Sequence, residues 1–269
     1  MAADEPQAVL AGRGVLVTRP AHQADELCRL VEAAGGRAIR FPVLEIQPPR
    51  DLAAGKDGLR RLGDYDLAIF VSANAVQHGL AALAPLPWPP QVEIAAIGAA
   101  TAQALKRRGL AVAYCPAQAF TSEALLALPQ LQQLAGRRIL ILRGEGGRER
   151  LRETLRARGA RVDYLEVYRR AQPDTDPLPL LQRWQAGEIG AVLVTSDESL
   201  RKLVAMIGTL GMPLLRATPL IVANARTLAL ARELGLDGPV RVAADATDAA
   251  MTEALCAHFS VARWNHDYE

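Results

Sequence analysis

Short apolar segments alternate with amphipathic segments along most of the chain. Six apolar segments stand out: VLVT (15–18), LAIFVS (67–72), EIAAIG (93–98), ILIL (139–142), AVLVTS (191–196) and PLIVAN (219–224). They lack regular alternation with polar residues, so we predict strands that are buried on both faces. A parallel sheet with helices on both sides has such strands, and the pattern therefore predicts a doubly wound α/β architecture.

The segments between the strands carry helix signals. In 20–34 the apolar residues recur at helical spacing, Pro20 fits the first turn, and Gly35 is placed to end the helix. In 196–207 the same spacing follows Ser196, which predicts an N-cap at that serine.

The chain also repeats itself. Four pairs of segments align in order: 12–46 with 136–170, 68–76 with 192–200, 95–105 with 221–231, and 119–128 with 245–255. We infer an internal duplication of a unit of roughly 125 residues, which is an ordinary domain size. Two extended segments that run into prolines, 41–49 and 165–177, occupy matching positions and are candidate linkers. The two domains therefore either divide near residue 135 or exchange parts through these segments.

Composition and charge narrow the function classes. The net charge is +2 and 22% of the residues are charged, so charge gives no indication of a nucleic-acid or membrane partner. The start of the chain lacks the pattern of a secretory signal, and no apolar run is long enough to span a membrane, so we expect a cytoplasmic protein. The three cysteines, Cys28, Cys115 and Cys256, are far apart and predict neither a disulfide framework nor a zinc site.

A glycine-rich turn follows the strand predicted at 139–142. Its sequence, RGEGGR (143–148), has neither the glycine spacing of a dinucleotide-binding loop nor the Gly-Lys-Ser/Thr of a phosphate loop. We therefore expect no nucleotide there. The glycines either let the turn approach a polycarboxylate ligand or form a tight turn with positive φ.

Polar side chains recur where a predicted strand gives way to a helix. They are Arg19, Ser72, Asn74, Thr101, Thr121, Ser122, Arg143, Ser196 and Thr227. Each hydroxyl has a simple alternative role as an N-cap. Together they mark the carboxyl ends of the strands, where open α/β sheets bind ligands, and guanidinium groups and helix N-termini suit carboxylates.

No acid–base or nucleophile constellation stands out, and the four histidines are scattered. An enzyme of this kind would work through binding and orientation. Tyr168, in the second candidate linker, either offers its hydroxyl to a ligand or packs against the sheet edge.

Seven motifs together resemble the uroporphyrinogen-III synthase family. They are TRP (18–20), FVSANAV (70–76), IGAATA (97–102), TSEALL (121–126), LRGEGGRERL (142–151), LEVYRRAQP (165–173) and VTSDESL (194–200). The resemblance implies two similar doubly wound, flavodoxin-like parallel-sheet domains joined by a two-stranded linker. It places domain 1 at 1–41 and 173–262, domain 2 at 48–166, the linker strands at 42–47 and 167–172, and a tail at 263–269.

The resemblance also implies an activity, that of a cyclising lyase in heme biosynthesis. The substrate would be hydroxymethylbilane, a linear tetrapyrrole with many carboxylates, held between the domains. The product would be uroporphyrinogen III, formed with inversion of the last pyrrole ring and loss of water. No cofactor or metal is expected, and we expect a monomer.

By the same resemblance the catalytic tyrosine falls on Tyr168. Carboxylate-binding groups fall on Ser72, Thr101, Ser196 and Thr227. The turn Asn224-Ala225-Arg226 departs from the family pattern, and we expect Arg226 itself to take a carboxylate.

A binding protein that closes on an anionic small molecule without chemistry is the competing hypothesis. It has the same expected fold. Most such proteins are exported, however, and this sequence lacks the signal pattern.

Overall fold

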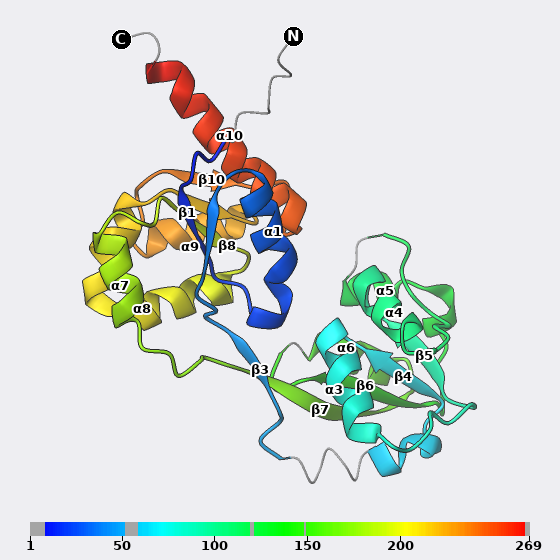
Figure 1. Ribbon diagram of the computed structural model, residues 1–269. Coiled ribbons are helices and arrows are strands. Elements are labelled where there is room, and N and C mark those ends of the chain that lie inside the picture. Colours follow the sequence, from blue (N-terminus) through cyan, green and yellow to red (C-terminus); the bar gives the residue numbers. More distant parts are fainter. Residues whose placement is uncertain (1–8, 52–58, 119–120, 148, 267–269) are drawn as a thin grey trace, which may run out of the picture. The chain divides into compact units, whose positions relative to one another are not determined.

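The computed structural model describes residues 9–51, 59–118, 121–147 and 149–266, with the backbone alone for 261–266. The chain divides into two compact units, with the divisions between Glu45 and Ile46 and between Arg170 and Ala171. Unit 1 thus combines two distant stretches of sequence, whereas unit 2 is the stretch between them (Figure 1).

Unit 1 is built on a parallel sheet. Its strands are β1 (Gly14–Val17), β2 (Arg37–Arg40), β8 (Ala191–Val194), β9 (Leu220–Val222) and β10 (Val240–Val242). Their spatial order is β2-β1-β8-β9-β10, and all neighbours are parallel. This is the strand order of flavodoxin-like sheets, as predicted.

Helices cover both faces of that sheet (Figure 1). They are α1 (Asp25–Ala33), α7 (Leu178–Gln185), α8 (Asp197–Ala217), α9 (Ala225–Glu233) and α10 (Asp248–His266). Leu16 of β1 packs into a core with α7, α8 and α9, while Val15 and Val17 pack into another with α1 and α10. The prediction of strands buried on both faces is therefore confirmed for β1.

Unit 2 has the same layered construction. Its strands are β3 (Glu45–Gln47), β4 (Leu67–Phe70), β5 (Glu93–Ala96), β6 (Arg138–Gly144) and β7 (Arg161–Ala171), in the order β3-β7-β6-β4-β5. β4 pairs in parallel with β5 and β6, and β6 with β7. Helices α3 (Ala73–Leu83) and α4 (Ala99–Lys106) cover one face, and α5 (Ser122–Leu126) and α6 (Arg150–Ala157) cover the other.

The internal duplication is confirmed at the level of strand register. In unit 1, Val15 pairs with Ala191. In unit 2, the residues 124 positions away from each, Ile139 and Leu67, pair with each other. The strand order β2-β1-β8-β9 of unit 1 thus matches β7-β6-β4-β5 of unit 2.

The structure corrects two details of the helix predictions. Pro20 precedes a short 3-10 turn, Ala21–Gln23, so α1 begins only at Asp25. Acidic residues in its first turn complement the helix dipole there. At the other end of the chain, α10 continues to His266, into the segment expected to be a tail.

Candidate functional site

Tyr168 and Ser72 meet at the carboxyl edge of the unit 2 sheet. Tyr168 lies near the end of β7 and is 2% exposed, and its hydroxyl oxygen is 3.1 Å from the Ser72 Oγ. Ser72 is also the N-cap of α3, accepting a hydrogen bond from the Ala75 amide at 3.1 Å. The serine therefore links the helix start to the phenol, whose ring packs in the core of unit 2.

Gly144 makes room for the Tyr168 ring. The two residues are paired across β6 and β7. A Cβ atom at position 144 would lie 2.7 Å from two ring carbons of Tyr168, which is closer than such contacts allow. A glycine at the end of β6 is therefore required for this position of the tyrosine.

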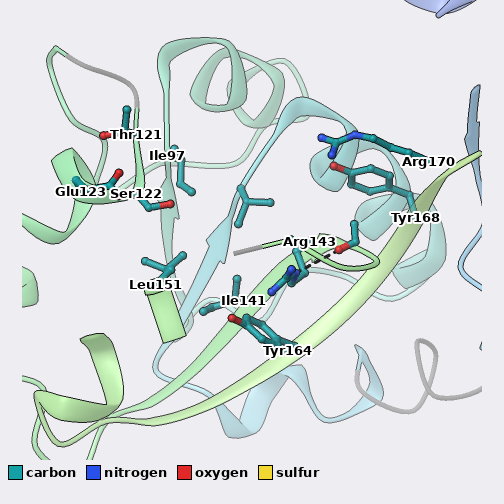
Figure 2. A pocket seen from close by; sticks show the side chains of 13 residues that line it. Ile97, Thr121, Ser122, Glu123, Ile141, Arg143, Leu151, Tyr164, Tyr168 and Arg170 are labelled. Carbon is teal, nitrogen blue, oxygen red and sulfur yellow. Dashed lines mark hydrogen bonds between the residues drawn. The ribbon is translucent and has the colours of Figure 1, made fainter. Parts of the chain in front are cut away.

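A cavity of about 350 Å³ opens at the same edge (Figure 2). Arg143, Tyr164, Tyr168 and Arg170 contribute to its lining, together with Thr121 and Ser122 from the start of α5. Four of the residues singled out from the sequence, Thr121, Ser122, Arg143 and Tyr168, thus share one cavity.

The glycine-rich turn wraps around Arg143. The Arg143 side chain is 7% exposed, its Nη1 is 3.3 Å from Glu149 Oε1, and its Nε donates to the Gly144 carbonyl at 3.2 Å. Gly146 and Gly147 have φ values of +72° and +106°, which confirms the prediction of positive φ. A Cβ at Gly147 would lie 2.6 Å from the Arg143 Nη2, so this glycine also leaves space for the guanidinium.

The other predicted residues of unit 2 occupy helix starts. Thr121 is the N-cap of α5 and accepts from the Ala124 amide at 3.1 Å, and Ser122 is the first residue of that helix. Asn74 is the second residue of α3. The N-cap of α4 is Gly98, so the N-cap role considered for Thr101 is wrong, and Thr101 is 5% exposed inside the helix.

In unit 1, the Asp197 carboxylate connects the start of α8 with the start of α9. Ser196 caps α8 as predicted, accepting from the Ser199 amide at 3.1 Å. Asp197 follows it, accepts a hydrogen bond from the Thr227 hydroxyl at 2.6 Å, and pairs with the Arg226 Nε at 2.6 Å. In the sequence, Asp197 is recognisable only as an acidic residue in the first turn of a predicted helix. That position does not reveal its contacts with Thr227 and Arg226.

Thr227 and Arg226 differ in exposure. Thr227 is fully buried, whereas the Arg226 side chain is 70% exposed. The N-cap of α9 is Asn224, which accepts from the Thr227 amide at 3.0 Å, so the N-cap role considered for Thr227 is wrong. The two helices capped by Gly98 and Asn224 therefore each carry a buried threonine three residues after the cap.

Arg19 follows β1 and is tied to the start of α10. Its Nη2 donates to the Ala246 carbonyl at 2.5 Å and lies 3.3 Å from Asp248 Oδ1. Burial raises the pKa of the Asp248 carboxyl, while the Arg19 charge opposes that rise. Arg19 is thus a partly buried cation, with 18% of its side chain exposed at the sheet edge.

Sequence reasoning missed Tyr164, four residues before Tyr168 on β7. The strand register shifts between the two tyrosines, so Tyr164 packs on the α5 and α6 face of the sheet and Tyr168 in the core on the α3 and α4 face, although both line the cavity. Among the residues that the structure describes, no group of three or more His, Cys, Asp or Glu is arranged to hold a metal ion. Within the same ranges, no helix is both long and apolar enough to cross a membrane.

Known proteins share this sequence and fold. The family model of uroporphyrinogen-III synthase HemD matches residues 25–253. Over 245 residues the chain is 39% identical to the uroporphyrinogen-III synthase of Escherichia coli strain K12, covering 90% of this chain and 99% of the relative. The Salmonella typhimurium enzyme of that name is also 39% identical, over 246 residues, with 90% and 99% coverage.

A solved structure has the same fold. A mutant uroporphyrinogen III synthase from the extremely thermophilic bacterium Thermus thermophilus matches with a TM-score of 0.61 at 22% identity, covering 91% of this chain and 97% of that chain. The match of the family model to most of the chain, together with relatives aligned over nearly their full length, shows the family. This chain belongs to the uroporphyrinogen-III synthase family.

Proposed function

We propose that this chain converts hydroxymethylbilane into uroporphyrinogen III in heme biosynthesis, closing the linear tetrapyrrole with inversion of its last pyrrole ring and loss of water. The observation that carries the proposal is 39% identity to a uroporphyrinogen-III synthase over 99% of that protein's length. The arrangement at the carboxyl edge of the unit 2 sheet supports it, because a phenol and a buried guanidinium line one cavity there.

In this proposal Tyr168 assists the first step. Its hydroxyl gives its proton to the terminal hydroxyl of the bilane, which leaves as water when the carbon–oxygen bond breaks. An azafulvene cation remains, and attack by the last pyrrole ring leads through a spiro intermediate to the inverted macrocycle. The tyrosinate regains a proton from the pyrrole that loses one after ring closure. Ser72, at 3.1 Å, holds the phenol in place for the first proton transfer. Because the cation also closes without inversion, catalysis depends on orienting the chain and excluding water.

The remaining predicted residues are assigned to the carboxylates of the substrate. They are Arg19, Ser72, Asn74, Thr101, Ser122, Arg143, Ser196, Arg226 and Thr227. The support is their position at the ends of strands and the starts of helices in both units, where free amides and cations favour anions. We further propose a cytoplasmic monomer that needs no cofactor, and light scattering of the pure protein checks the expected mass of 28.9 kDa.

A direct assay tests the activity. The protein is incubated with enzymatically generated hydroxymethylbilane, and the porphyrin isomers are separated after oxidation. Formation of the type III isomer supports the proposal. A binding protein without chemistry would leave the spontaneous type I isomer as the sole product.

A further inference from the structure

Tyr164 contacts two guanidinium groups. The Arg143 guanidinium carbon is 4.3 Å from the centroid of its ring, and that of Arg152 is 4.4 Å from it. Figure 2 shows Arg143 and Tyr164 close together in the wall of the cavity. Cation–π contacts of this kind hold the ring in a defined orientation.

The Tyr164 hydroxyl lacks a partner. Its oxygen is buried and makes no hydrogen bond of good geometry within the described part of the chain. Burial raises the pKa of this phenol; Arg143 and Arg152 lower it, whereas Glu149 raises it through its charge and as a nearby hydrogen-bond acceptor. Because buried polar groups in native proteins are normally satisfied, a protonated hydroxyl that makes no well-formed bond to Glu149 can donate to an acceptor from outside.

The charges around Tyr164 favour an anion. Glu149 is shared, with Oε1 at 3.3 Å from Arg143 and Oε2 at 2.5 Å from Arg152. One carboxylate therefore balances two guanidinium groups, one of which is almost fully buried. The Glu123 carboxylate in the cavity lining is itself paired with Arg150 at 3.4 Å. A cavity with surplus positive charge concentrates anionic groups.

We propose that Arg143 and the Tyr164 hydroxyl form a subsite for one carboxylate of the linear tetrapyrrole, an inference that rests on the proposed function. Both groups donate, and a carboxylate can accept from each at once. The cavity volume, about 350 Å³, is near the lower end of ligand pockets, which span roughly 300–1,000 Å³. The subsite thus holds an acidic side chain of the substrate rather than a whole tetrapyrrole.

The variant Tyr164→Phe tests the hydroxyl while the ring stays against both arginines. We expect the KM for hydroxymethylbilane to rise about tenfold, because a hydrogen bond to a charged group is lost. The melting temperature should stay the same or rise, since no internal hydrogen bond is removed. A hydroxyl with a purely structural role would instead lower the melting temperature and leave KM unchanged, and that result would overturn the subsite.

Tyr65→Phe is the matched control. The Tyr65 hydroxyl donates to Asp163 Oδ2 at 3.0 Å, outside the cavity lining and just before β4 begins. We expect the reverse result, a lower melting temperature with unchanged KM. An equal rise of KM in both variants would count against a specific role of Tyr164.

Substrate analogues test Arg143 independently of folding. Hydroxymethylbilanes that each lack one carboxylate are assayed with the wild type and with Arg143→Gln. For one analogue we expect a loss of about tenfold in kcat/KM with the wild type and no further loss with the variant. If, for every analogue, the loss from the missing carboxylate and the loss from Arg143→Gln multiply, the subsite is overturned. The proposed function would still stand. A wild type that forms no type III isomer from the full substrate would instead overturn the proposed function, and this ligand with it.

Discussion

At the scale of single residues, the proposed chemistry depends on how Tyr168 is held. Its ring is buried against Gly144, and its hydroxyl meets a serine whose other role is to cap a helix. The phenol is thereby oriented by packing and by one hydrogen bond, without a charged partner at its oxygen in the described hydrogen bonds.

Replacing Tyr168 by Phe tests this role. Turnover should fall by roughly one to two orders of magnitude, typical of a lost acid contribution. Because a single hydrogen bond is removed, the free energy of unfolding should fall by only about 1 kcal/mol. Initial rates with enzymatically generated hydroxymethylbilane, together with urea unfolding, measure both effects. Near-normal turnover would remove Tyr168 from the catalytic mechanism.

The sequence predicted which polar residues lie at the sheet edge, but not which residues they contact. Strand ends and helix starts placed Arg143 and Ser122 at one edge, the family resemblance added Tyr168, and all three line one cavity. Asp197 and Tyr164 were missed, because their roles depend on residues that are distant in sequence or on another strand. Local sequence patterns predict where a residue lies on a strand or helix, whereas tertiary packing determines which residues its side chain contacts.

At the scale of elements, the turns between a strand and the following helix place Ser72 and Ser196 at the sheet edges. The starts of α3 and α8 are equivalent, since Ser72 and Ser196 have nearly the same backbone angles and each accepts a hydrogen bond from the amide three residues on, at 3.1 Å. This helix start therefore repeats in the two units with the same chemistry.

Ser72→Ala separates the two roles of this serine. We expect a loss of about 1 kcal/mol in the free energy of unfolding from the missing N-cap, and a fall in turnover because Tyr168 loses its partner. Thr247→Ala is the control, since Thr247 accepts from the Ala250 amide at 3.2 Å at the start of α10. It should lose similar stability with unchanged turnover. Equal turnover in both variants would show that the Ser72 contact does not support catalysis.

Gly144→Ala tests the fit between β6 and β7. The added Cβ would lie 2.7 Å from the Tyr168 ring, and overpacking of this kind costs about 1–3 kcal/mol. We expect lower stability and reduced turnover together. In Gly190→Ala, the control, the nearest atom would be 3.7 Å away, an ordinary contact. A Gly144→Ala protein with full stability and turnover would contradict the proposed constraint on the tyrosine.

Most elements could be predicted because their signals are local. Apolar runs predicted six of the ten strands in the described residues, β1, β4, β5, β6, β8 and β9, and Ser196 predicted the cap of α8. The end of β7 was expected as extended chain within 165–177, but its start at Arg161 and its continuity as one eleven-residue strand were not predicted. Pairing with β6 and β3 extends it, and pairing between distant segments is not visible in a local pattern.

At the scale of the whole molecule, duplication explains the discontinuous unit. Equivalent strands occupy equivalent places in both sheets, although unit 1 is assembled from both ends of the chain and unit 2 from its middle. The repeat was visible in the sequence because four blocks align in order. The proline-bounded segments and the family resemblance suggested that one domain is assembled from both ends of the chain.

The central claim is that this chain directs ring closure to the inverted isomer. The most direct measurement is the ratio of uroporphyrin III to uroporphyrin I formed from fresh hydroxymethylbilane, after oxidation and chromatography, as protein concentration is varied. We predict predominantly type III, formed at a rate proportional to protein and abolished by heat denaturation. Type I alone, at the rate of a protein-free control, would contradict the account.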